Sequence, residues 1–75
     1  MLFELCHLDG SVREYATEEA ALHEIYQLVE RGDRAMAADT ALSCSTVTGP
    51  SRPIAAGDVL VDRAVRRFGR QRRWA

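Results

Sequence analysis

The chain has 75 residues and a formal net charge of −1, so it makes one domain and leaves no room for a second. A chain of this size buries only about 60% of its surface on folding, so its core is marginal. The sequence has no apolar run of about 18 residues and no charged-then-apolar leader, which argues against membrane spanning and export. Composition therefore predicts a small cytoplasmic protein that gains stability by forming a homodimer.

The two cysteines support the same compartment. Cys6 and Cys44 lie inside alternating apolar runs rather than at turns. Secreted domains of this size usually carry two or more disulfides at loop positions. We therefore expect both thiols to be free and buried, where they act as small hydrophobic side chains.

A β-hairpin is predicted at the N-terminus. Residues 1–8 alternate between two faces, and Asp9 and Gly10 follow them. Asp-Gly is among the strongest short-range hairpin signals, because a type I′ turn needs positive φ at both central residues. Residues 11–16 then return as a second strand.

The register of this hairpin depends on whether its loop has two residues or a bulged three. The longer loop pairs Leu5 with Tyr15 and Leu8 with Val12, so apolar side chains lie opposite one another more consistently. We therefore favour the longer loop.

A helix is predicted between Thr17 and Gly32. The Thr17 hydroxyl can accept a hydrogen bond from an early helical N–H, and Glu18 and Glu19 complement the positive end of the helix dipole. Gly32 supplies the left-handed residue that commonly follows a helix. The apolar stripe expected to face the core consists of Ala21, Leu22, Ile25, Leu28 and Val29.

The middle of the chain is predicted to form a second pair of strands. Residues 33–39 are rich in alanine and fit either a helical extension or a connector. Residues 40–47 alternate and are rich in β-branched and small side chains, which predicts a strand, and residues 48–51 predict a turn. Residues 52–54 form a short strand, which should lie at an edge because Pro53 has no N–H to donate.

A second amphipathic helix is predicted to begin at Gly57 or Asp58 and to end before Gly69. The order of strand, glycine turn, strand and helix then occurs twice. We predict an α+β fold in which two β-β-α units form a small antiparallel sheet with two helices on one face. This domain spans residues 1–69, and residues 70–75 form a basic C-terminal tail. The apolar stripe of the second helix consists of Leu60, Val61, Ala64, Val65 and Phe68.

Charge is divided unevenly along the chain. Residues 1–62 hold eleven acids and four arginines, a net charge of −7, whereas residues 63–75 hold six arginines and no acid, a net charge of +6. Guanidinium groups can hold phosphate oxygens and an indole can stack on a base, which predicts contact with nucleic acid. Alternatively, the arginines suit a helix C-terminus and a solvated tail, or they dock on the acidic face of this chain or of a partner subunit. The candidate binding residues are Arg63, Arg66, Arg67, Arg70, Arg72, Arg73 and Trp74.

Residue sets typical of catalysis or metal binding are not recognisable in the sequence. Ser43, Cys44 and Ser45 have no histidine at a supporting spacing, and the chain has no glycine-rich phosphate loop. Cys6 and His7 are neighbours on a predicted strand, so their side chains point to opposite faces and do not easily share one ion. We therefore expect no catalysis, no cofactor, no metal and no small-molecule substrate.

Two functions follow from these observations. The first is a small regulatory or inhibitory protein that binds another protein through its sheet or its helices, as a homodimer. The second is a nucleic-acid-binding module that uses the arginine-rich segment. An acidic surface could also meet a basic partner, and its residues would be Glu18, Glu19, Glu24, Glu30, Asp33 and Asp39.

Overall fold

A computed structural model describes the backbone of residues 2–46 and 49–72, and the side chains of these ranges up to residue 69. In chain order the elements are β1 (Leu2–Cys6), β2 (Val12–Tyr15), α1 (Glu18–Glu30), α2 (Arg34–Ala38), β3 (Ala41–Ser45), β4 (Arg52–Ala56) and α3 (Gly57–Arg72).

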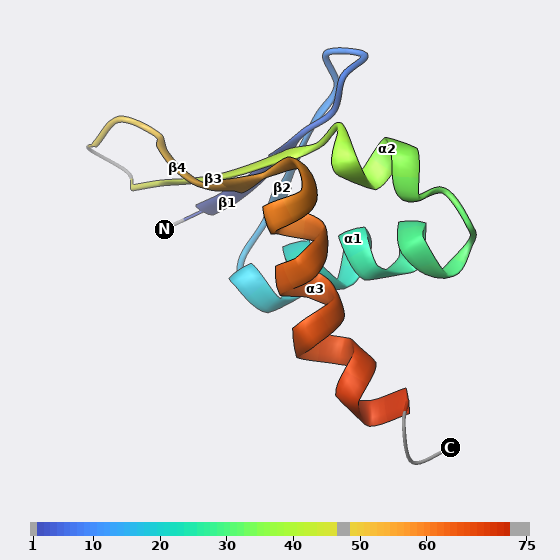
Figure 1. Cartoon of the computed structure of the whole chain (residues 1–75). Helices are drawn as coiled ribbons and strands as arrows, with labels where there is room; N and C mark the ends of the chain where they lie inside the picture. The colour runs from blue at the N-terminus through green and yellow to red at the C-terminus, as the bar shows by residue number, and fades with distance from the viewer. Residues whose placement is uncertain (1, 47–48, 73–75) are drawn as a thin grey trace.

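The four strands form one antiparallel sheet in the order β2-β1-β3-β4. All three helices lie on one side of it, so the molecule has a sheet layer and a helix layer (Figure 1). The predicted α+β class and antiparallel sheet are confirmed. The structure adds a third helix, because the alanine-rich stretch that fitted either a helix or a connector forms α2.

The β1–β2 hairpin has the bulged three-residue loop, but its register differs from the predicted one. Phe3 pairs with Tyr15 and Cys6 with Val12, two positions away from the expected pairing. Gly10 has a φ of 91° and donates its N–H to the His7 carbonyl at 3.0 Å, as in a three-residue loop that ends in a left-handed glycine. The loop geometry therefore sets the register, and apolar pairing does not.

Both predicted ends of α1 are confirmed. The Thr17 hydroxyl accepts a hydrogen bond from the Ala20 N–H at 3.1 Å. At the other end Gly32 has a φ of 82°, and its N–H reaches the Val29 carbonyl at 3.0 Å. The next N–H, of Asp33, reaches the Leu28 carbonyl at 2.9 Å, which completes a Schellman motif.

Strand β4 lies at an edge of the sheet, as Pro53 predicted, and α3 follows it with no intervening loop. Gly57 makes this junction possible with a φ of 63°, and its N–H donates to the Thr40 carbonyl at 3.3 Å. Helix α3 then continues through Gly69 to Arg72, so the predicted end before Gly69 is wrong. A glycine inside a helix costs only about 1 kcal/mol relative to alanine. The neighbouring arginines are good helix formers, so the helix continues through Gly69.

The core lies between the sheet and the helices. Leu22, Ile25 and Leu60 are buried as predicted, and they contact Leu5 of β1 and Leu42 of β3 within one apolar cluster. Ala21, Leu28, Val61 and Ala64 are also buried. Three predicted core residues are only half-buried at its margin: Val29, Val65 and Phe68.

Candidate protein-binding surface

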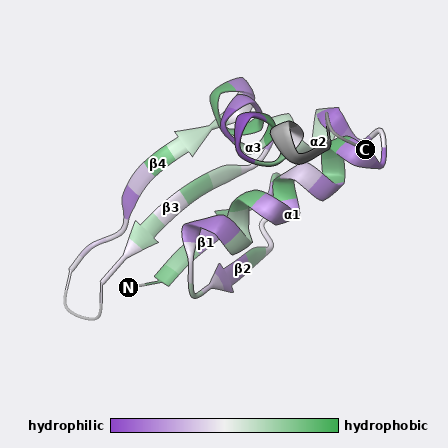
Figure 2. Ribbon diagram, turned by 90° about the horizontal axis from the view of Figure 1, so that it is seen from below, coloured by the Kyte–Doolittle hydropathy of each residue, from purple (hydrophilic) through white to green (hydrophobic). Residues whose placement is uncertain are grey.

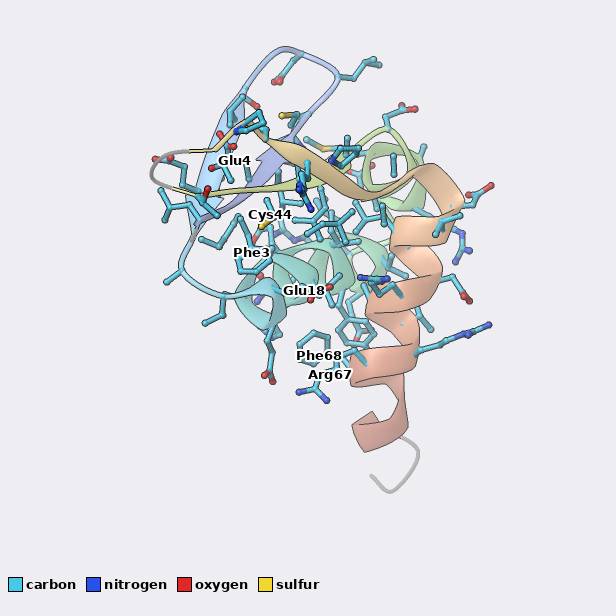
Figure 3. The ribbon with its side chains drawn as sticks, turned by 90° about the vertical axis from the view of Figure 1, so that its left-hand side faces the viewer. Phe3, Glu4, Glu18, Cys44, Arg67 and Phe68 are labelled. Carbon is cyan, nitrogen blue, oxygen red and sulfur yellow. The ribbon has the colours of Figure 1, made fainter. Side chains whose placement is uncertain are left out.

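One face of the sheet is not covered by any described element. Strand neighbours alternate between faces, so Phe3 and Cys44 point toward α1 while Glu4 points away from the helices (Figure 3). Seen from below, the four strands lie side by side in the order β4, β3, β1 and β2 (Figure 2). We call the uncovered side the open face.

A row of apolar side chains crosses the open face from one edge to the other. Cys6 pairs with Val12 on one side and with Ala41 on the other, and Ala41 pairs with Ala56. All four side chains are exposed, and Val12 is 52% accessible. Leu2, which is 43% accessible, lies on the same face at the other end of β1, four pairs away and beyond Glu4. The row therefore spans every strand, at the end of the sheet where β1 and β4 end and β2 and β3 begin.

The exposure of Cys6 corrects the prediction that both thiols are buried. Both cysteines are free, but Cys6 lies exposed on the open face and Cys44 is half-buried on the helix face. The pattern misled because alternation cannot say which side of a strand the helices will cover. The two thiols lie on opposite faces, so they cannot form a disulfide within the chain.

A second row beside the apolar one is acidic. Glu4 of β1 and Glu14 of β2 are paired residues on the open face. Ser51 donates a hydrogen bond from its hydroxyl to Glu4 at 3.2 Å, while Glu14 is exposed. Like charges directly across a strand pair destabilise a sheet, so this pair favours the approach of a cation.

The described arginines of α3 form ion pairs with acids of this chain. Arg63 lies 2.6 Å from Glu18, and Arg67 lies 3.1 Å from Glu19, so two arginines reach the first turn of α1. Arg66 pairs with Asp62 on its own helix at 2.9 Å. Leu22 completes the shallow cleft between these side chains. This arrangement matches the alternative in which the arginines dock on the chain's own acidic face.

The other predicted binding residues lie further along the chain. The backbone at Arg70 and Arg72 belongs to α3. Arg73 and Trp74 lie outside the described residues. The sequence could not reveal the contact between α1 and α3 in which the Phe68 ring meets the His23 ring edge-on, with centroids 5.2 Å apart.

A second cleft lies between the hairpin tip and α2. His7, Asp9 and Asp39 line it together with two exposed apolar side chains, Leu8 and Met36. Hydrogen bonds to Asp9 from the Ser11 hydroxyl and N–H lower the pKa of its carboxyl and keep it ionised. Apolar and acidic groups lie close together here, which suits a basic side chain with an apolar stem.

The imidazole at this cleft is fixed by a buried hydroxyl. Thr40 donates its hydroxyl hydrogen to the Met36 carbonyl at 2.9 Å, so toward His7 it can only accept. The His7 Nδ1 atom, 3.2 Å away, is therefore the donor. No three His, Cys, Asp or Glu side chains among the described residues come together as a metal site.

Tyr15, at the end of β2, carries a buried polar group on the helix face of the sheet. Its hydroxyl is buried and has no hydrogen-bond partner among the described residues. Burial raises the pKa of the phenol, the Glu24 carboxylate raises it further, and the neighbouring Arg13 guanidinium offsets part of this rise.

Comparison of the chain with protein-family models, with curated proteins and with solved structures finds no match. Within the described part of the chain, no helix has the length and apolar character that crossing a bilayer requires.

Proposed function

We propose that this protein is a small, non-enzymatic regulatory or inhibitory protein that acts by binding other proteins, and that two copies join through the open face of the sheet. The observation that supports it is the apolar row of Val12, Cys6, Ala41 and Ala56, which crosses all four strands with no helix over it. Contiguous apolar side chains that lie in water are characteristic of a protein–protein interface.

The dimer adds the stability that a chain of this size lacks on its own. The proposal includes a cytoplasmic location. Two thiols on opposite faces of one sheet, one of them exposed, suit a reducing compartment better than a secreted domain, which would use its cysteines as a disulfide.

The dimer is tested by placing a charge in the apolar row. Ala41→Glu introduces a carboxylate on a central strand at an exposed position, where it displaces no core atom. Gln27→Glu is the matched control, because Gln27 is exposed on α1 in the opposite layer. Sedimentation at about 100 μM should give a dimer for the wild type and for Gln27→Glu, and a folded monomer for Ala41→Glu. A wild type that stays monomeric while melting cooperatively would refute the proposed dimer.

A second candidate function is nucleic-acid binding through α3. It is favoured by the continuation of α3 to Arg72, since residues 63, 66, 67 and 70 recur at the spacing of one helix face. Binding by six arginines should give a slope of about −5 in a plot of log affinity against log salt on duplex DNA. Truncation after Gly69 removes three of the six arginines and should roughly halve that slope. A shallow slope in both forms would leave protein binding as the function.

A further inference from the structure

The two edges of the sheet differ in their capacity to accept another strand. Strand β4 carries Pro53, which has no N–H to donate, and its pairing with β3 shifts register at Leu42 and Ser43. Proline and bulges are the devices by which proteins block an edge. Strand β2 has no proline and pairs in regular register along its whole length. Only the β2 edge is therefore open.

The hairpin geometry identifies the backbone groups that β2 offers. The His7 N–H donates to the Ser11 carbonyl at 2.9 Å, which sets the hydrogen-bonding phase of the ladder. Antiparallel pairs alternate between bonded and non-bonded, so Arg13 bonds toward β1. Val12 and Glu14 then direct their N–H and C=O groups away from the sheet, and both residues are exposed. Two donors and two acceptors are thus available to a fifth strand.

The charge around this edge selects the occupant. Glu14 lies opposite Glu4 on the open face. On the helix face, the Arg13 guanidinium lies 3.9 Å from the Glu24 carboxylate, which makes a loose ion pair. The side chain of Glu24 is 22% accessible. A basic residue placed opposite Glu14 would lie one strand spacing away from it and would pair with its carboxylate. A second copy of this chain would bring another Glu14 and the net negative charge of its residues 1–62, so it is the wrong occupant for this edge.

We infer that the β2 edge binds an extended basic segment of a partner protein as a fifth strand, with a basic residue opposite Glu14 and an apolar residue two positions away beside Val12. This inference rests on the proposed protein-binding function and identifies the partner's chemistry. It uses the edge of the sheet and the dimer uses the open face, so either can fail while the other holds. Main-chain hydrogen bonds supply the affinity and the alternating side chains supply the selectivity.

The test uses a synthetic peptide with the pattern Arg-Thr-Val-Thr-Arg, capped at both ends, which presents the same side chains in either strand direction. Its control has Glu in place of both Arg. In an NMR titration of the full chain, the Arg peptide should give saturable shifts at β2 and slow the hydrogen exchange of the Val12 and Glu14 amides. The Glu peptide should bind about tenfold more weakly or not at all.

Two variants separate the backbone and charge contributions. Val12→Pro removes an outward N–H and leaves both carboxylates, so it should abolish binding. Glu14→Arg keeps the backbone and reverses the charge, so it should reverse the preference between the two peptides. The second variant decides the matter if the first unfolds, as judged by its circular dichroism melt.

Three results would overturn the inference. One is the absence of saturable shifts with the Arg peptide, and another is an unchanged peptide preference in Glu14→Arg. The third is protection of the Val12 and Glu14 amides that rises with protein concentration alone, since a second copy would then occupy the edge. A monomer in sedimentation together with peptide binding at β2 would refute only the dimer.

Discussion

The Arg63 guanidinium lies 2.6 Å from the Glu18 carboxylate and joins α3 to the first turn of α1. The two residues belong to different helices and are 45 positions apart in sequence. The side chains are 45% and 39% accessible, so solvent screens much of their attraction. The pair therefore contributes little to the stability of the fold.

A double-mutant cycle on Arg63→Ala and Glu18→Ala should give a coupling free energy of about 0.3–1 kcal/mol that fades at about 1 M salt. The Arg66 and Asp62 pair is the matched control, because it lies on one helix and is more exposed. Its coupling should be smaller still. A coupling above about 2 kcal/mol at Arg63 would show that the pair is far better shielded from water than its accessibility indicates.

Ile25→Ala should lower the free energy of unfolding by about 2–4 kcal/mol, because the side chain is 0% accessible at the centre of the core. A loss of this size would unfold much of a domain with so small a core. Chemical denaturation followed by circular dichroism measures it. Gln27→Ala, on the exposed side of the same helix, should change the midpoint very little. Equal effects at the two positions would contradict the packing of α1.

Gly69→Ala should raise the free energy of unfolding by about 0.5–1 kcal/mol, since alanine is the better residue inside a helix. An added Cβ would lie 3.5 Å from the Val65 Cγ1 atom, an ordinary contact. Thermal unfolding compares the two proteins. If α3 instead ended at this glycine in a left-handed conformation, the same substitution would destabilise the protein.

Tyr15→Phe should raise the free energy of unfolding by about 1 kcal/mol near neutral pH, because it removes a buried hydroxyl without a partner. The raised pKa of this phenol adds a pH dependence. The folded state holds the phenol proton more tightly, so deprotonation favours unfolding. The free energy of unfolding of the wild type is therefore unaffected below the unfolded pKa of about 10 and falls at higher pH. The advantage of the Phe variant should therefore widen above about pH 10. A constant difference across this range would show that Tyr15 is solvated.

The sequence predicted the features that depend on local chemistry. Thr17 caps α1, Gly32 ends it, and Pro53 marks an edge strand, because each of these residues has few conformations or few partners to choose from. The hairpin register could not be decided in this way. A shift by two positions leaves every side chain on the same face, so the apolar pattern is equally satisfied before and after it.

The ion pairs that the arginines form could be found only from the tertiary structure. Arg63 and Arg67 meet Glu18 and Glu19 only because α1 and α3 pack side by side, which no spacing in the sequence expresses. Because the helices were predicted on one face of the sheet, its other face was expected to be uncovered. That Cys6 belongs to it depends on where the helices fold.

The blocked β4 edge limits how far these chains can assemble. A sheet with two free edges can add copies at both ends and grow into a fibre, as amyloid does. Here Pro53 and the register shift close the β4 edge. When a second copy adds through its β2 edge, the joined sheet therefore exposes only closed β4 edges. The addition of copies of this chain at the edge must stop after one step. The protein can therefore display an open strand to a partner at high concentration without becoming the seed of a polymer.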